Sequence, residues 1–220
     1  MTFLIKNGTI VNAYEKYKAD LLIKSGKISA IGKSLDQKVD QVIDAHGKYI
    51  FPGGIDAHTH FAIPFMGTVS AGFDTTPAAA VGGTTTIIDF TPQPKDMSLI
   101  DALHKHREEQ AEGKVAIDYS LHSMVQDAQQ NIFSELPALI KAGVPTIKLF
   151  MAYKGMPFHS SDDVIFKMLQ HSKEEGMLVM LHCENGGIID ILQNQLVSEG
   201  KTEPKYHADS RPLIVEAEAV

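Results

Sequence analysis

The sequence predicts an α/β protein whose larger part is a TIM-like (β/α) barrel, and three observations support this. After Pro52, short apolar runs alternate with segments of helical length, the pattern of repeated βα units and parallel strands. The first run ends in His-x-His rather than in the glycine-rich phosphate loop of a doubly wound sheet. Glycines stand where the helices should end, at Gly113, Gly143, Gly176 and Gly200.

Residues 1–52 are predicted to form a small β module. Asn7-Gly8 lies between two β-prone runs and predicts a hairpin, and Ser25-Gly26 repeats this plan. The module has too few strands to close a sandwich alone, which leaves its partner strands unaccounted for.

Residues 53–220 carry the predicted barrel. Strands are expected over 55–60, 85–90, 116–124, 146–152 and 177–183, and helices near 74–82, 98–112, 130–142, 161–175 and 186–199. Five or so βα units are visible, whereas a closed barrel has eight units and about 250 residues. The final segment, RPLIVEAEAV, looks like a helix without a cap. We therefore expect the N-terminal portion of a longer protein, and the alternative is a natural half-barrel that dimerises.

Composition and charge restrict the class of partner. The chain is 44% hydrophobic and 21% charged, which are ordinary globular proportions. The net charge of −7 and the scattered basic residues disfavour nucleic acid and membrane surfaces as partners. The single cysteine, Cys183, excludes an internal disulfide and fits a reducing compartment. The N-terminus lacks a signal-peptide pattern, and no apolar run approaches the roughly 20 residues of a membrane span. A cytoplasmic protein is expected.

Three histidines stand at predicted strand ends. His58 and His60 are two residues apart, so both imidazoles can point to one face of the strand. A random H-x-H is more often packed in a polar loop, but catalytic residues of barrels gather at strand ends. Two imidazoles on one face suit zinc or a similar divalent ion. His182 ends the fifth predicted strand. Alternation points Cys183 the other way, so we interpret it as a small core residue.

Lys148 is unusual because it lies inside an apolar strand and shares a face with Thr146 and Phe150. A buried ammonium is costly without a partner. Three interpretations stay open: a salt bridge to a strand-end aspartate (Asp56, Asp89 or Asp118), snorkelling to the surface, or a depressed pKa that lets the neutral amine add carbon dioxide. The resulting carbamate could bridge two metals.

The remaining histidines have weaker claims to a site. His104 and His106 fall on a charged helix and are expected to be solvated. His122 lies on a strand but has no partner in the pattern.

An ordered set of segments resembles the dihydropyrimidinases and D-hydantoinases of the amidohydrolase superfamily: YIFPGGIDAHTHF, GGTTTIIDF, KLFMAYKG, LVMLHCENG and YHADSRP. The similarity covers the whole chain. Single motifs such as H-x-H are weak, whereas the ordered set is highly specific. The resemblance implies a TIM-like barrel plus a β-sandwich shared between the two ends of the protein. Residues 1–52 would then be half of that sandwich.

The resemblance also implies a site with two divalent metals, usually zinc. His58 and His60 would hold one metal and His182 the other, and Lys148, carboxylated on its side-chain nitrogen, would bridge them. A hydroxide bridging the metals would attack a cyclic amide carbon, and Tyr153 would donate its hydroxyl to the substrate carbonyl. Two further ligands are expected past the present end: a histidine on the sixth strand, and an aspartate on the eighth that is also the general acid/base.

Two segments correspond to substrate-gating loops of that family. Phe65, Met66, Met156 and Phe158 would line a pocket for the side group of the ring, or would be exposed loop tips. Dihydroorotases typically carry an arginine two residues after the second histidine, where this chain has Ala62, so a carboxylate-bearing ring is disfavoured. Dihydropyrimidinase-related neuronal proteins have lost metal ligands, whereas this chain keeps them, so an enzyme is favoured.

The predicted function is the metal-dependent hydrolysis of 5,6-dihydropyrimidines or hydantoins to N-carbamoyl amino acids. The resemblance also implies a homo-oligomer, commonly a tetramer. The alternative is that this chain alone is a non-catalytic fragment or scaffold, lacking two metal ligands and the general acid/base. Such a piece would expose apolar strand edges and self-associate.

Overall fold

The computed structural model describes residues 1–65, 67–128 and 132–220. The chain divides into two compact units, Met1–Gly54 and Ile55–Val220, and each is described by itself. None of the helices in the described ranges has the length and apolar character needed to cross a bilayer.

The first unit is a small all-β module of two sheets. One sheet has the strand order β5-β4-β1-β6 and the other β3-β2-β7. The strands are β1 (Thr2–Lys6), β2 (Thr9–Val11), β3 (Lys16–Lys18), β4 (Asp20–Lys24), β5 (Lys27–Gly32), β6 (Gln41–Asp44) and β7 (Tyr49–Ile50). Ile10, Ala19 and Leu21 form its buried cluster. The predicted β module is therefore confirmed, while its place in a larger sandwich stays a prediction.

The two turn predictions in this unit have opposite outcomes. Ser25 and Gly26 both have positive φ angles and join the antiparallel pair β4–β5, so that hairpin is confirmed. The hairpin at Asn7-Gly8 is wrong, because β1 and β2 belong to different sheets. Asn7 does turn the chain with φ of 65°. However, β1 pairs with β4 and β6, so the local turn signal redirects the chain from one sheet to the other.

The second unit is built on a five-stranded sheet of order β14-β13-β12-β11-β8. The pairs β11–β12, β12–β13 and β13–β14 are parallel. The strands are β8 (Gly54–Thr59), β11 (Thr84–Pro92), β12 (Asp118–Met124), β13 (Thr146–Phe150) and β14 (Leu178–His182), all close to the predicted ranges. A two-stranded hairpin, β9 (Pro64–Phe65) with β10 (Thr68–Val69), follows β8.

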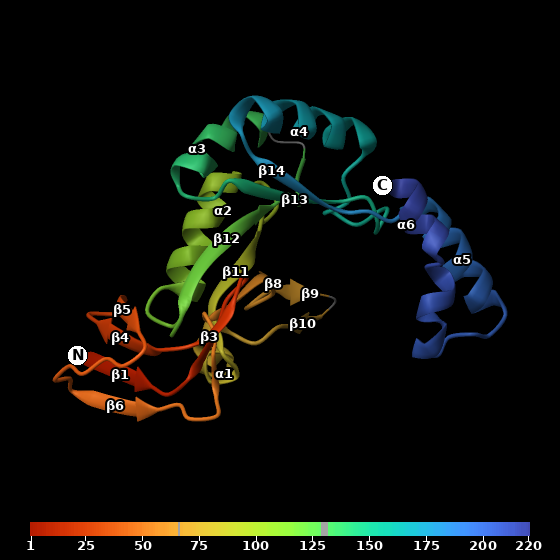
Figure 1. The fold of residues 1–220 in the computed structure, drawn as a ribbon. Coiled ribbons are helices and arrows are strands. Elements are labelled where there is room, and N and C mark those ends of the chain that lie inside the picture. Colours follow the sequence, from red (N-terminus) through yellow and green to blue (C-terminus); the bar gives the residue numbers. More distant parts are fainter. Residues whose placement is uncertain (66, 129–131) are drawn as a thin grey trace. The chain divides into compact units, whose positions relative to one another are not determined.

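Helices connect successive strands of this sheet, and Figure 1 shows α2, α3 and α4 following one another along one side of it. The connecting helices are α1 (Pro77–Gly82), α2 (Leu99–His106), α3 (Leu136–Lys141) and α4 (Asp162–Glu175), whereas α5 (Gly186–Ser198) and α6 (Leu213–Ala219) follow the last strand. Shorter helical turns are η1 (Phe73–Thr75), the π-helical continuation η2 (Arg107–Ala111), η3 (Ile132–Glu135) and η4 (Pro204–Ser210). The start of the helix expected over 130–142 lies partly outside the described residues.

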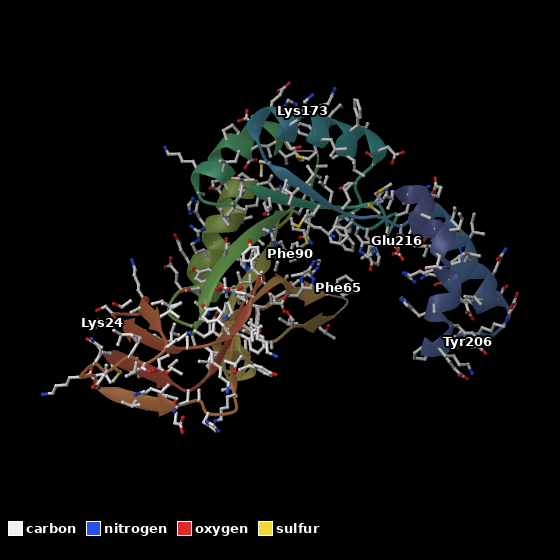
Figure 2. The ribbon with its side chains drawn as sticks, in the orientation of Figure 1. Lys24, Phe65, Phe90, Lys173, Tyr206 and Glu216 are labelled. Atoms are coloured by element: carbon white, nitrogen blue, oxygen red, sulfur yellow. The ribbon has the colours of Figure 1, made fainter. Side chains whose placement is uncertain are left out.

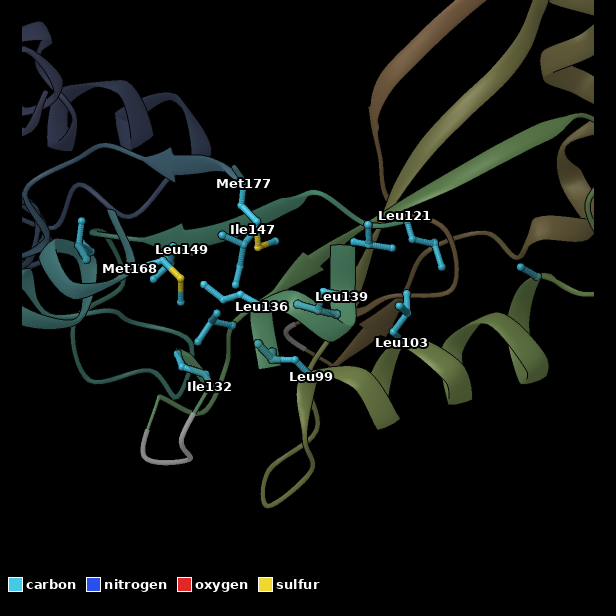
Figure 3. Packing of buried hydrophobic residues seen from close by; sticks show 14 of the residues in the cluster. Leu99, Leu103, Leu121, Ile132, Leu136, Leu139, Ile147, Leu149, Met168 and Met177 are labelled. Atoms are coloured by element: carbon cyan, nitrogen blue, oxygen red, sulfur yellow. The ribbon is translucent and has the colours of Figure 1, made fainter. Parts of the chain in front are cut away.

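The main core fills the space between these helices and one face of the sheet (Figure 3). Leu121 and Ile147 from the strands meet Leu103, Leu136 and Met168 from the helices. Because side chains alternate along a strand, the residues between these core positions point to the opposite, inner face. The sheet therefore has an apolar outer face under the helices and an inner face free to carry polar groups.

Candidate active site

The strand register gathers the predicted site residues on the inner face of the sheet. Lys148 pairs with Met180 across β13 and β14, and Phe150 pairs with His182. On the other side, Met124 pairs with Lys148. Parallel neighbours in register point to the same face, so these side chains share the inner face.

His58 and His60 lie beside Phe90 of β11. The His58 ring centre is 5.1 Å from that of His60 and 4.6 Å from that of Phe90, and the His60 ring is 5.0 Å from Phe90. Burial, followed by the neighbouring His60, Lys148 and His122, lowers the pKa of His58. The neutral imidazole is the form that binds a metal, so this environment favours a ligand state.

Lys148 is buried, with 7% of its surface exposed, so it does not snorkel. Its nitrogen lies 5.0 Å from the centre of the Phe150 ring. Among the described residues, no carboxylate lies within ion-pair distance of it. Burial lowers the pKa of Lys148, and the nearby Cys183 opposes this shift more weakly. Of the three interpretations, the depressed pKa is the one that this environment supports.

His182 is held by an acidic neighbour that the sequence did not single out. Its Nε2 lies 2.7 Å from Oε2 of Glu184, and Oε1 of Glu184 lies 3.6 Å from Nε of Arg211. Both partners fall within segments of the family resemblance, HCENG and DSRP. Cys183 is a free, half-buried thiol that lies outside the main hydrophobic clusters, so the interpretation as a core residue is wrong.

His122 is a further inner-face residue, and the expectation that it has no partner is wrong. It is buried, and its ring stands 4.8 Å from Phe90. Nε2 is 3.0 Å from the Ala57 carbonyl oxygen and Nδ1 is 2.6 Å from Oγ1 of Thr146. Burial lowers its pKa, and a neutral ring satisfies both bonds by donating to the carbonyl and accepting from the hydroxyl.

Three aromatic residues, Tyr153, Phe158 and Phe65, form an aromatic wall beside the histidines. Tyr153 follows β13 with a positive φ of 61°, which is uncommon for a residue other than glycine. Its ring centre is 5.3 Å from Phe158, 5.7 Å from His182 and 6.5 Å from Phe65. Phe65 on β9 and Phe90 on β11 are both labelled in Figure 2.

The first turn of α5 packs closely against the segment that carries Tyr153. Gly186 follows the cap residue Asn185, whose side chain accepts bonds from the Gly187 and Ile188 amides. A Cβ atom on Gly186 would lie 3.1 Å from the Met151 carbonyl oxygen and 3.3 Å from the Lys154 nitrogen. Glycine is what permits this approach.

A cavity of about 480 Å³ lies between the inner face of the sheet and the aromatic residues around Tyr153. It brings together the predicted residues His58, His60, Lys148, His182, Tyr153, Phe65 and Phe158. Met66 lies outside the described residues, and Met156 is 41% exposed and does not line the cavity. Aromatic walls with a few polar groups at one end are typical of a small-molecule site.

The donor set fits part of a metal centre. Within residues 1–65, 67–128 and 132–220, no three His, Cys, Asp or Glu side chains are grouped closely enough to hold a metal. His58 and His60 therefore need a third donor, and the adjacent inner-face group is the Lys148 amine. A carboxylated Lys148 would supply two oxygens there.

Comparison with known proteins identifies the family of the chain. Residues 49–216 match the amidohydrolase family, so the chain belongs to the amidohydrolase family. The chain is 48% identical to a D-hydantoinase of Geobacillus stearothermophilus, over 100% of this chain and 47% of that protein. It is 42% identical to a dihydropyrimidinase of Dictyostelium discoideum, over 99% of this chain and 44% of that protein. The resemblance to D-hydantoinases and dihydropyrimidinases is therefore confirmed.

Solved structures confirm the fold class. A crystal structure of D-hydantoinase matches with a TM-score of 0.93 and 47% identity, covering 100% of this chain and 48% of that one. A dihydropyrimidinase structure from Brevibacillus agri also gives 0.93, at 45% identity, with the same coverage. The five-stranded sheet with its helices is thus part of a TIM-like barrel, and the chain spans about half the length of the relatives it matches.

Proposed function

We propose that the protein containing this chain hydrolyses the cyclic amide bond of 5,6-dihydropyrimidines or hydantoins to give N-carbamoyl amino acids. The names of its relatives support this reaction class. The observation that carries the proposal is the convergence of His58, His60, Lys148, His182 and Tyr153 on one cavity. These residues come from three strand ends and one following loop, the usual location of barrel active sites.

The metal ligands form the second part of the proposal. His58 and His60 would hold one divalent metal and His182 a second, with carboxylated Lys148 between them, and zinc suits this donor set. When bound, such metals supply Lewis-acid chemistry that activates water and polarises a carbonyl. The buried, uncompensated environment of Lys148 supports carboxylation because it disfavours the ammonium form.

Tyr153 and the aromatic wall would bind and orient the ring. The Tyr153 hydroxyl would donate to the substrate carbonyl oxygen as negative charge develops there. Phe65 and Phe158 would pack against the side group at the ring carbon, because both border the cavity next to Tyr153. No arginine is among the described lining residues, and Ala62 occupies the position expected for one in dihydroorotases, so a neutral ring is favoured.

A second candidate concerns these 220 residues by themselves. Since the described residues hold no group of three standard ligands, the isolated chain would act as a non-catalytic scaffold that binds metal weakly. Metal analysis separates the two candidates, because two tightly held equivalents per chain would contradict the scaffold.

The boundary near residue 52, the homo-oligomeric state and the cytoplasmic location belong to the same proposal. The division of the structure after Gly54 supports such a boundary. The single cysteine supports a reducing compartment.

The decisive experiment follows ring opening of dihydrouracil and hydantoin by the natural protein containing this sequence, with zinc and bicarbonate supplied. We expect activity that Lys148→Ala abolishes and that Lys173→Ala, an exposed lysine on α4, leaves intact. Wild-type activity in the Lys148→Ala variant would refute the proposed role of this lysine. Inactivity of the wild type on both rings would refute the substrate class.

A further inference from the structure

Asp89 is a buried carboxylate that the proposed chemistry does not use. It lies on β11 next to Phe90, but it points to the outer face of the sheet and is fully buried. In register it pairs with Leu121, a member of the main core. A carboxylate in this apolar layer is costly unless its oxygens are bonded, so its partners need an explanation.

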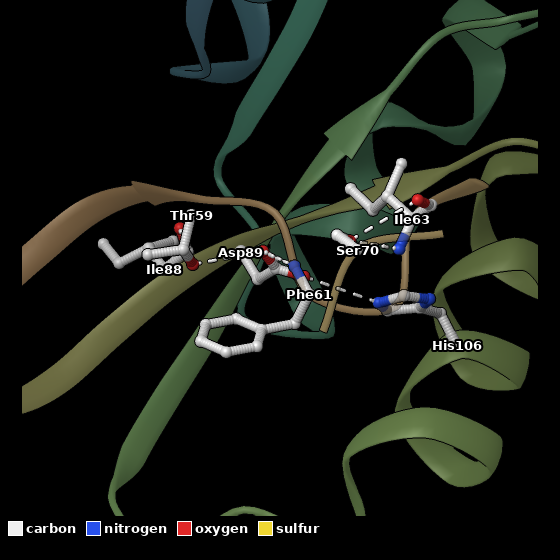
Figure 4. A network of polar contacts seen from close by, with 7 residues as sticks. All are labelled: Thr59, Phe61, Ile63, Ser70, Ile88, Asp89 and His106. Atoms are coloured by element: carbon white, nitrogen blue, oxygen red, sulfur yellow. Dashed lines mark hydrogen bonds and ion pairs between the residues drawn. The ribbon is translucent and has the colours of Figure 1, made fainter. Parts of the chain in front are cut away.

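One oxygen of Asp89 binds both residues that flank His60. Oδ1 accepts a bond of 3.1 Å from the Thr59 hydroxyl and a bond of 2.9 Å from the Phe61 amide. The Thr59 hydroxyl is also 3.3 Å from the Ile88 carbonyl oxygen. Figure 4 shows the network, with the chain of Thr59 to Phe61 bent around the carboxylate. His60 is therefore fixed from both sides by a single atom.

The second oxygen faces another buried group. Oδ2 of Asp89 lies 3.7 Å from Nε2 of His106, and neither atom has a hydrogen-bond partner elsewhere in the described part of the chain. His106 is 8% exposed, so the prediction that it is solvated is wrong. Its ring meets Phe73 edge-on at 5.9 Å, and Phe73 stacks on Phe61 at 5.2 Å. His106 thus supports both Asp89 and the ring of the residue after His60.

The segment that follows Phe61 is also held by hydrogen bonds. The Ala62 amide donates to the Ala71 carbonyl oxygen at 2.8 Å, and the Ile63 amide donates to the Ser70 hydroxyl at 2.8 Å. Ala62 has a positive φ of 52°, so the chain turns sharply directly after Phe61. The Asp89 bond to Phe61 and this hydrogen-bonded turn together fix the course of the chain on the C-terminal side of His60.

We propose that Asp89, supported by His106, is a positioning residue that holds His60 beside His58 by binding the two residues on either side of it. This rests on the proposed function only in the use made of the two histidines. Outer partners that orient ligands typically change metal affinity by about 10–100-fold when removed. Asp89 does not line the cavity, and its hydrogen bonds go to Thr59 and Phe61 rather than to the ring of His58 or His60, so it acts on His60 through the residues on either side of it.

The test compares variants of the natural protein that contains this sequence, with and without metal. Asp89→Ala removes both bonds, whereas Asp89→Asn keeps an oxygen that can accept them. Asp20→Ala is the matched control, because Asp20 is also buried and accepts two backbone amides, from Asn7 at 2.9 Å and Leu35 at 3.0 Å, in the other unit. Nuclear magnetic resonance of the metal-free natural protein records the His58 and His60 ring signals and the exchange rate of the Phe61 amide. A Co²⁺ titration followed by visible absorption records affinity.

We expect Asp89→Ala to shift the two ring signals, to speed exchange of the Phe61 amide and to weaken Co²⁺ binding by about 10–100-fold. Asp89→Asn should keep all three readouts close to their wild-type values, and Asp20→Ala should leave them unchanged. Unaltered ring signals in a folded Asp89→Ala chain would overturn the proposal. If that variant does not fold, Thr59→Val, which deletes one of the two bonds, decides by the same ring signals. A failure of the enzymatic proposal would appear separately, as absent ring opening in the wild type.

Discussion

The side-chain nitrogen of Lys148 lies 5.0 Å from the ring centre of Phe150, two residues further along the same strand. This buried amine therefore faces an aromatic ring, and no described carboxylate lies within ion-pair distance of it. A cation–π contact offsets part of the cost of burial but does not hold the proton as a buried ion pair would. Burial therefore lowers the pKa of the Lys148 amine without a carboxylate partner to oppose the shift.

Replacing Lys148 by Met should stabilise the metal-free chain at neutral pH. Burial holds the pKa of Lys148 below its ordinary value of 10.5, so the unfolded chain binds this proton more tightly. Stability then rises with pH between the folded-state pKa and 10.5, and the cost of Lys148 is full below that window. We expect Lys148→Met to raise the free energy of unfolding by on the order of 1 kcal/mol at pH 7.

Urea unfolding in bicarbonate-free buffer with a chelator measures this gain. The stability gain of Lys148→Met over the wild type should shrink as the pH approaches 10.5. Lys173→Met, on the exposed side of α4 (Figure 2), should show no such pH dependence. A Lys148→Met chain that is less stable than the wild type at neutral pH would show that the ammonium is compensated after all.

Tyr153→Phe should remove catalysis and leave the fold intact. The phenylalanine ring keeps the packing against Phe158 and His182, while the hydroxyl proposed to stabilise developing charge is lost. We expect kcat of the natural protein to fall by about 10²–10³-fold with little change in thermal stability. Steady-state ring opening and calorimetry provide the two readouts. Tyr206→Phe, in η4, is the control, and equal kcat values for both variants would remove Tyr153 from the mechanism.

His122→Ala should destabilise the chain, because it removes the hydrogen bonds from the His122 ring to Ala57 and to Thr146. Losing both should lower the free energy of unfolding by roughly 1–3 kcal/mol at pH 7.5. Because burial lowers the pKa of His122 below 6.5, its contribution is full above pH 6.5 and is lost as the pH falls through the folded-state value. The difference between wild type and variant should therefore narrow on acidification.

Denaturant unfolding at several pH values checks this prediction. The control is His104→Ala, an exposed histidine on α2, for which a difference near zero is expected throughout. A His122 effect that grows at low pH would mean that the ring is bound in its charged form.

Asn185 should prove to be structural although it stands in the motif that carries His182. Its side-chain oxygen accepts from the amides of Gly187 and Ile188 at the start of α5. Asn185→Ala should cost about 1 kcal/mol of stability, and Asn185→Ser, another good cap, should recover most of it. Thermal unfolding compared with Asn194→Ala, inside α5 and exposed, measures the effect. A loss with Ser as large as with Ala would assign the effect to the bond between Asn185 and Glu218.

The periodic features of the chain were predictable because they are local. The alternation of apolar runs and helices located the five strands, and Gly113, Gly143, Gly176 and Gly200 all adopt the positive φ that a helix end requires. The Asn7-Gly8 hairpin failed for the complementary reason. Which strand β1 pairs with depends on β4 and β6, and a turn signal carries no information about distant partners.

Only those site residues were predictable that a sequence motif or the alternation of side chains along a strand identifies. Lys148, His58, His60 and His182 stand out by position, but His122 needed the register that pairs it with Phe90. His106 was hidden by its charged neighbours, although Leu99, Ala102 and Leu103 precede it at helical spacing and mark the same buried face. The sequence suggested Asp89 only as a strand-end partner for Lys148, because its actual partners lie on another helix and strand end and could not be inferred from local sequence.

The close approach of Gly186 to the backbone at Met151 and Lys154 has a mechanical consequence. A methyl group at residue 186 would meet backbone atoms rather than a flexible side chain, so the turn that bears Tyr153 or the N-terminal end of α5 would have to shift by a few tenths of an ångström to accept it. A larger residue at position 186 would therefore displace the segment that carries Tyr153 without itself lining the cavity.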